Sequence, residues 1–447
     1  ILARLGFSTA ISTSMTTITW YGDYIAPDFT DENLWNRYLK QYIPESGSKN
    51  FTIDPLLDYI IFNYFKSSCE FKTFDQYQSG QPGVVIIGLH GGWNEQKLEL
   101  ITNWFASDTN RHAAFVDPMC QIIIDYSEEG FAEEVFVDLQ AWIAKHGLVD
   151  RVLYVSSTCN VQSLYYKWCQ RKRVPRIMEC AWYGFFANWI NFNQRYRDKP
   201  ELGIPMAHWT PGTNRFMSLN RRPYPHRIFL TTLLEHFKLI EHGAVSMPKH
   251  FEEKDINWGS TDFDLPYQWQ QLKDRCNGYV DKFDNSFKSL YNKLPLIADT
   301  DRFDINYALD LNNTLYDIYP VNLVTETLFF TDSIFPTEKI FKPMMHGQIF
   351  LLAGAPGFLR QLQDFGFQTF GEFIDESYDN IDDPIERGVA LMQTLSSIVN
   401  LSDYEFSILL NKCKGIIEHN RHLLTNKEFM DRLISTHVVN AIESHWN

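Results

Sequence analysis

The sequence predicts an α/β protein with two similar domains that face a central cleft, followed by a helical C-terminal tail. Three apolar runs, at 83–90, 121–131 and 151–157, alternate with segments of helical spacing. Buried parallel strands joined by crossover helices give this alternation. The alternation restarts near residue 215, and a length of 447 residues suffices for two or three domains.

The first domain is predicted to span residues 1–214, with residues 1–80 as a partly helical extension. Each of its three strands precedes or follows a helical segment, at 94–107, 132–147 and 161–172. Residues 195–214 are rich in proline, glycine and charge, which indicates a linker at the end of this domain.

The second domain is predicted to span residues 215–447. We expect strands at 215–220, 244–247, 321–330 and 348–356, and helices at 228–243 and 336–347. Prolines are expected to keep residues 221–227 outside the helix that follows them. From Pro384 onward the helical pattern is almost continuous, whereas residues 251–300 fit no element clearly.

Composition narrows the classes of function. A formal net charge of −15 argues against broad, unspecific nucleic-acid binding, which needs a basic surface. The chain has no apolar run of about 18 residues, so no membrane span is predicted. Seven cysteines without a C-x-x-C pair indicate free thiols in a reducing compartment, and we expect a cytoplasmic protein. The aromatic share of 15% suits either a core of large side chains or a cleft that binds sugars or bases.

The most informative segment is FPTEKIFKP at 335–343. A helix that begins here presents free backbone N–H groups and a partial positive charge, which suit a phosphate. Lys339 adds a mobile positive charge, and Glu338 could accept hydrogen bonds from the two neighbouring hydroxyls of a ribose. The alternative is a glutamate that complements the helix dipole, beside a solvated lysine.

Residues 324–356, VTETLFFTDSIFPTEKIFKPMMHGQIFLLAGAP, resemble the donor-binding segment of the α1,3/α1,4-fucosyltransferases. That family carries an acidic residue, a short gap, a Thr-Glu-Lys-aliphatic-aromatic-basic run and a strand that ends near Gly-Pro. The positions that match are Glu326, Thr337, Glu338, Lys339, Phe341 and Lys342. The C-terminal half also resembles virus- and phage-type glycosyltransferases, through Asn-Arg-Arg-Pro-x-Pro-His-Arg at 220–227 and Gly-Ala-Pro-Gly at 354–357.

The resemblance implies a GT-B fold with two Rossmann-like domains and a nucleotide-sugar held by the C-terminal one. It places Glu338 near the ribose and Lys339 near the diphosphate, and it implies a virus- or phage-encoded protein in the host cytoplasm. This sequence departs from the family where Val-Thr-Glu replaces a Phe-Glu-Asn run. The sugar and the nucleotide, GDP or UDP, therefore stay open.

A second candidate phosphate-binding segment is NRRPYPHR at 220–227, which follows a predicted strand. Guanidinium groups bind phosphate oxygens in pairs, and fixed cations stabilise the charge of a leaving nucleoside diphosphate. We favour Arg221 and Arg222 over Arg227, which we expect on a later helical face. The alternatives are an exposed basic loop and a salt-bridge cluster between domains.

The base that would take the proton of an acceptor hydroxyl is sought at the strand ends of the first domain. The candidates are Asp125, His90 and Glu128. Glu128 could instead cap the next helix, and His90 could be a turn residue. Other side chains expected around this cleft are Trp93, Asn94, Ser127, Glu129 and Asn160. Trp182 and Tyr183 could stack on a sugar ring, although such residues are more often core.

No metal site is predicted. Asp-x-Asp patterns at 262–264 and 299–301 match metal-dependent glycosyltransferases, but patterns this short arise by chance in an acidic chain. Lysine and arginine could supply the charge that a metal would otherwise bring.

The sequence thus predicts a metal-independent glycosyltransferase without a cofactor, which moves a sugar from a nucleotide-sugar to a carbohydrate or other hydroxyl acceptor. One alternative is a phage-type enzyme that glycosylates a DNA base. The basic segment 170–173 favours this alternative, whereas the net charge of −15 argues against it. The other is a non-catalytic binding or structural protein that keeps the fold.

Overall fold

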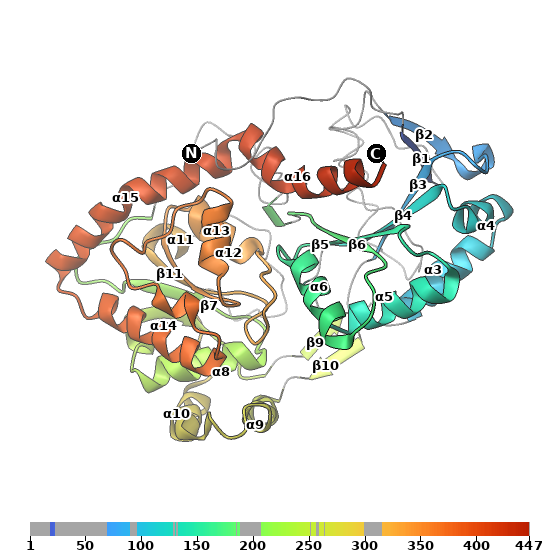
Figure 1. Ribbon diagram of the computed structural model, residues 1–447. Coiled ribbons are helices and arrows are strands. Elements are labelled where there is room, and N and C mark those ends of the chain that lie inside the picture. Colours follow the sequence, from blue (N-terminus) through green and yellow to red (C-terminus); the bar gives the residue numbers. More distant parts are fainter. Residues whose placement is uncertain are drawn as a thin grey trace. The chain divides into compact units, whose positions relative to one another are not determined.

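The computed structural model describes residues 18–22, 69–89, 96–127, 130, 133–184, 186–187, 207–250, 252–255, 259–262, 264–298 and 315–446 (Figure 1). It divides into two compact units. The first unit comprises 1–126, 134–155 and 175–179, and the second comprises 127–133, 156–174 and 180–447, within the described residues. The predicted helices before residue 69 and most of the predicted linker lie outside the described residues.

The first sheet has six strands in the order β2-β1-β3-β4-β5-β6. Their bounds are β1 Ile18–Gly22, β2 Cys69–Thr73, β3 Gly83–Gly88, β4 Cys120–Tyr126, β5 Val152–Ser156 and β6 Glu179–Trp182. The pairs β1–β2, β1–β3 and β3–β4 are parallel. The three predicted strands are confirmed as β3, β4 and β5, and all their residues except Gln121 are buried, as continuous apolar runs require.

Four helices lie between these strands in the sequence. They are α3 Gln96–Ala106, α4 Thr109–Val116, α5 Glu133–His146 and α6 Val161–Lys172. The sequence predicts α3, α5 and α6 but not α4, whose start is marked only by Asp108. The Asp108 carboxylate accepts the backbone N–H groups of Asn110 and Arg111, which makes it a regular helix cap.

The second sheet has four strands in the order β12-β11-β7-β8, all of them parallel. Their bounds are β7 Phe216–Leu219, β8 Gly243–Ser246, β11 Val321–Thr325 and β12 Ile349–Ala353. The register pairs Leu219 with Ser246 and Thr325 with Ala353, so the four carboxyl ends lie at one edge. This sheet confirms the four strands that the sequence predicts after residue 214.

Two boundaries in this region differ from the prediction. The strand predicted at 321–330 ends at Thr325, and the next five residues form a loop. The helix predicted from residue 228 is α8 Pro225–His236, which begins three residues earlier and ends well before Gly243. Pro225 occupies the first turn of α8, where a missing N–H breaks no helical hydrogen bond. His226 and Arg227 therefore lie in the helix and not in the loop before it.

The remaining elements belong to the second unit. Residues 251–300 hold an antiparallel pair, β9 Glu252–Asp255 with β10 Gly259–Asp262, and two helices, α9 Leu265–Arg275 and α10 Asp284–Lys293. The other helices are α11 Leu315–Ile318, α12 Glu338–Met345, α13 Phe358–Asp364, α14 Pro384–Val399, α15 Asp403–Thr425 and α16 Lys427–Trp446. The predicted helical tail is confirmed. No described helix combines the length and the apolar character that crossing a membrane needs.

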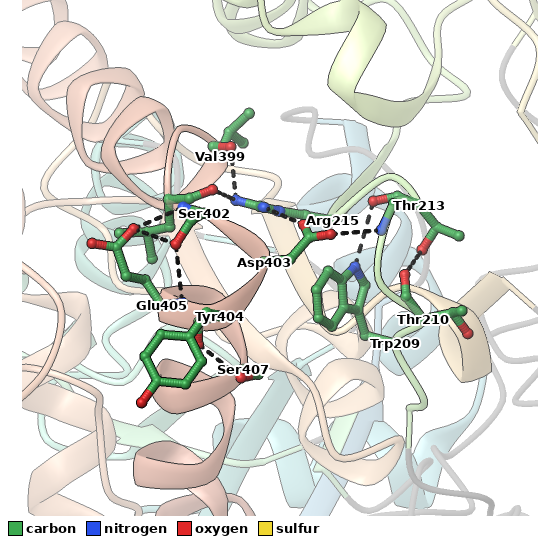
Figure 2. Close-up of polar contacts among 12 residues, drawn as sticks. Trp209, Thr210, Thr213, Arg215, Val399, Ser402, Asp403, Tyr404, Glu405 and Ser407 are labelled. Atoms are coloured by element: carbon green, nitrogen blue, oxygen red, sulfur yellow. Dashed lines mark hydrogen bonds and ion pairs between the residues drawn. The ribbon is translucent and has the colours of Figure 1, made fainter.

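Arg215, directly before β7, fastens the tail helices to the second sheet (Figure 2). Its Nη1 donates to the carbonyl oxygens of Ile398, Val399 and Leu401 at 3.2, 2.9 and 2.5 Å, where α14 ends. Its Nη2 binds Asp403 at 2.9 Å, at the start of α15. One guanidinium thus satisfies carbonyls that a helix end leaves without partners.

Replacing Arg215 by methionine is expected to lower the free energy of unfolding by about 3 kcal/mol, because several buried carbonyls and one carboxylate lose their donor. Urea unfolding followed by circular dichroism measures the change. Lys414→Met is the control, since Lys414 makes an exposed pair with Glu418 at 3.7 Å and should change stability by less than about 0.5 kcal/mol. Equal effects of the two variants would contradict the assigned role of Arg215.

Candidate functional site

The candidate site lies at the carboxyl edge of the second sheet. Asn220 follows β7, and its side-chain oxygen accepts the hydroxyl of Thr325, the last residue of β11, at 2.7 Å. The backbone N–H of Asn220 donates to Ser246 at the end of β8. These bonds tie three strand ends together, so the segments that follow them are held close to one another. Ligands of open parallel sheets bind outside this edge.

Glu326, the first residue after β11, fixes the start of α12. Its carboxylate accepts the backbone N–H of Thr337 at 3.2 Å and the hydroxyl of Thr337 at 2.5 Å. Thr337 in turn caps α12, because its Oγ1 accepts the backbone N–H of Lys339 at 3.2 Å. The acidic residue and the Thr-Glu-Lys run of the sequence motif thus form one hydrogen-bonded unit.

Glu338 and Lys339 open α12 as an ion pair. Lys339 Nζ lies 2.8 Å from Glu338 Oε1, and also 3.3 Å from Thr337 Oγ1 and 3.4 Å from Thr327 Oγ1. Glu338 is buried, whereas 29% of the Lys339 side chain is exposed. Burial alone would raise the pKa of Glu338, but the charges of Lys339 and Lys342 outweigh it and hold the pKa below its usual value. Glu338 is therefore an ionised acceptor beside a half-exposed cation.

The segment 220–227 joins the same edge through His226. The Nε2 atom of His226 lies 2.9 Å from the carbonyl oxygen of Glu326. Burial, followed by the charge of Arg227, lowers the pKa of His226 well below its ordinary value. The imidazole is then neutral, and its proton must be on Nε2 to donate to that carbonyl. The two motifs that the sequence predicts separately are therefore in direct contact.

Arg227, which the sequence analysis places after Arg221 and Arg222, is the buried arginine of this segment. It is buried in the first turn of α8, and its Nη1 donates to the carbonyl of Arg222 at 3.2 Å. Its Nε has no hydrogen-bond partner among the described residues, although a buried donor normally has one. Arg221 and Arg222, which we favoured, are half-buried and lie just before it. Only the position of Pro225 as a first-turn residue could have indicated that Arg227 points inward.

The predicted catalytic residues divide into one that is described and two that are not. Asp125 is buried at the carboxyl end of β4, as predicted. His90 and Glu128 lie outside the described residues, as do Trp93, Asn94 and Glu129. Ser127 is buried, and its carbonyl oxygen accepts a hydrogen bond from Ser157 Oγ.

Trp182 and Tyr183 are core residues. Both are buried, and Trp182 stacks on Phe365 with a centroid distance of 4.4 Å and an interplanar angle of 7°. The sugar-stacking role that the sequence allowed is therefore wrong for Trp182, since its ring face is already covered. The core interpretation of these aromatic residues holds.

The described part of the chain contains no cluster of potential metal ligands. No group of three or more His, Cys, Asp or Glu side chains there could hold an ion. Asp264 is exposed before α9, and residues 263 and 299–301 are outside the described residues.

Comparisons with known proteins give only distant similarities. No protein-family model matches the chain. No curated protein matches it either.

Among solved structures, the chain is similar to Anabaena HepE in complex with UDP and glucose, at 12% identity and a TM-score of 0.40, over 96% of this chain and 100% of that one. It is also similar to a Rickettsia africae glycosyltransferase, at 10% identity and a TM-score of 0.36, over 96% of this chain and 97% of that one. A third similar structure is an α1,3-fucosyltransferase with GDP-fucose, at 10% identity and a TM-score of 0.27, over 93% of this chain and 95% of that one. TM-scores this low carry no weight for the fold or the function of this chain.

Proposed function

We propose that the chain is a metal-independent glycosyltransferase that moves a sugar from a nucleotide-sugar to a hydroxyl acceptor, with two Rossmann-like domains of the GT-B type. The observation that carries this proposal is the meeting of two cationic segments at one sheet edge. Glu326 fixes the first turn of α12, with Lys339, through Thr337, and its carbonyl oxygen contacts His226 of α8. The buried Arg227 of α8 has no hydrogen-bond partner for its Nε among the described residues. A helix amino end with fixed cations suits a diphosphate.

The proposed donor site assigns one role to each side chain. Lys339 and Arg227, with Arg221 and Arg222, would bind the diphosphate and stabilise the charge that develops on it as the sugar leaves. Glu338 would accept the ribose hydroxyls, because its pKa is held low and it is ionised. Thr337 and Lys342 would support this geometry.

The acceptor side is assigned to the strand ends of the first sheet. We propose Asp125 as the base for the acceptor hydroxyl, with His90 and Glu128 as further candidates. Asp125 ends a buried parallel strand, which is where catalytic groups of such sheets are placed. A base in this position would take the hydroxyl proton as the new bond forms.

A thermal-shift screen of nucleoside diphosphates and their sugar conjugates tests the proposal. We expect one base to raise the unfolding midpoint, since a ligand at 100 times its dissociation constant adds about 2.7 kcal/mol. The shift should persist with EDTA, because the proposed site uses lysine and arginine in place of a metal. Slow release of free sugar from the donor without an acceptor would separate an enzyme from a non-catalytic binder. The absence of any shift across the panel would refute the proposed donor site.

A further inference from the structure

The loop between β11 and α12, Thr327–Pro336, has no helix or strand of its own, yet it sets where the candidate donor site begins. On one side it is held by Arg387 of α14, whose Nη2 donates to the carbonyl of Phe329 at 2.6 Å. The Nε of Arg387 donates to Gly354, just after β12, at 3.1 Å. This arginine ties the first half of the loop to the sheet.

The second half of the loop is held by Asn160, which lies directly before α6 in the same compact unit. Asn160 Nδ2 donates to the carbonyl oxygen of Asp332 at 2.8 Å, and its Oδ1 accepts the backbone N–H of Ile334 at 3.1 Å. The backbone N–H of Cys159 donates to the carbonyl of Ile334 at 2.8 Å. The side-chain amide thus pairs with the loop backbone as a neighbouring strand would.

Asn160 makes these bonds in place of the one that its position favours. It is the residue before the first turn of α6, where asparagine is among the best capping residues, yet its side chain makes no capping bond. Forgoing a cap lowers local helix stability. Residues that break a local rule in this way are typically found where a site needs them.

Two further contacts bring the same part of the unit against the loop. A Cβ atom on Gly130 would lie 2.6 Å from Leu328 Cδ1 and 2.7 Å from Phe335 Cδ1, so only glycine fits there without a shift. The ring of Phe186 meets that of Phe335 edge-on at 5.6 Å. The loop is therefore packed on side chains as well as hydrogen-bonded.

We infer that Asn160 is a positioning residue for the donor site: its amide fixes Asp332 to Ile334 and thereby the place where Thr337 and Lys339 start α12. This inference rests on the proposed function for its ligand, but the restraint on the loop can be measured without any ligand. Asn160 does not touch the donor in this scheme and acts only through the loop.

Asn160→Ser separates positioning from folding. Serine is a good helix cap, so α6 should be as stable as before, while both bonds to the loop are lost. We expect an unchanged or higher unfolding midpoint and faster hydrogen exchange in peptides that cover 328–337. Affinity for the nucleoside diphosphate found in the screen should fall on the order of tenfold, since two hydrogen bonds that order the loop are absent.

Asn160→Asp is the conservative variant and Asn103→Ser the matched control. Aspartate keeps the acceptor for Ile334 but loses the donor to Asp332, so its exchange and affinity should lie between those of wild type and Asn160→Ser. Asn103 is exposed on α3, and serine there should leave exchange in 328–337 and nucleotide affinity unchanged.

Two results would overturn the inference. One is unchanged exchange in 328–337 for Asn160→Ser, and the other is faster exchange with unchanged nucleotide affinity. If the wild type binds no nucleoside diphosphate, the proposed function is the part that fails, and the exchange measurement alone decides whether Asn160 restrains the loop.

Discussion

Lys339→Ala is expected to weaken nucleoside diphosphate binding by about 100-fold, the largest ligand-binding effect that we expect of any single change. A charge-assisted hydrogen bond contributes about 1.5–3 kcal/mol, and the lost ammonium lies at the amino end of α12 where a diphosphate would bind. The loss also removes the partner of the buried Glu338, which would then face the ligand as an uncompensated negative charge. Isothermal titration calorimetry measures the affinity.

Inorganic pyrophosphate distinguishes the roles of the two neighbours. Lys339→Ala should weaken pyrophosphate and nucleoside diphosphate alike. Glu338→Gln should weaken the nucleoside diphosphate about tenfold, because a ribose loses a charged acceptor, and should leave pyrophosphate binding equal or tighter. Lys412→Ala, on the exposed face of α15, is the control and should change neither. If Glu338→Gln lowered the affinity for nucleoside diphosphate and for pyrophosphate equally, this would argue against a ribose contact.

Local patterns were sufficient to predict most of the second sheet. Val321–Thr325 and Ile349–Ala353 are short apolar runs bounded by turn residues, a pattern that is typical of buried strands. The same patterns could not show that β11 ends at Thr325, because Thr327–Phe330 continue the apolar run. Long-range bonds hold those residues as a loop: Thr337 donates its hydroxyl to the Glu326 carboxylate, and Arg387 donates to the carbonyl of Phe329.

The candidate site was predictable where its residues are neighbours in the sequence. Thr337, Glu338 and Lys339 interact with one another across one helical turn, as their spacing predicts. The bond from Asn160 to Ile334 joins residues 174 positions apart, and no local pattern encodes it. The inward position of Arg227 depends in the same way on how α8 packs. Long-range hydrogen bonds and burial are properties of the folded chain, which explains why sequence reasoning missed them.

Glu326→Gln is expected to stabilise the protein above neutral pH and to remove a pH dependence. Burial raises the pKa of Glu326 to about 7, despite the lowering effects of the Lys339 charge and the bonds from Thr337. In the unfolded chain the same group titrates near its ordinary value of 4.5. Between these two pH values the folded state binds more protons than the unfolded state. The contribution of Glu326 to the free energy of unfolding is therefore fully present below about pH 4.5 and is lost as the pH rises to 7. The loss is on the order of 3 kcal/mol.

Glutamine cannot ionise, yet it keeps an acceptor for the Thr337 N–H, so the variant should be more stable than wild type at pH 8 and nearly equal at pH 5. Unfolding midpoints measured from pH 5 to 8 give the difference, with Glu418→Gln on the exposed face of α15 as a control that should track the wild type. Parallel curves for Glu326→Gln and wild type would show that Glu326 does not titrate in this range.

Binding of the proposed ligand is expected to change the protonation of Glu326. A diphosphate bound beside Lys339 would raise the pKa of Glu326 further, because like charges disfavour ionisation. Nucleoside diphosphate binding at pH 7.5 should therefore take up a fraction of a proton. Calorimetry in two buffers of different ionisation enthalpy measures this uptake. The ligand's own phosphate titrates too, but it does so equally in both proteins, so the difference between wild type and Glu326→Gln isolates Glu326. If the two proteins take up protons equally, Glu326 is not the group that senses the diphosphate.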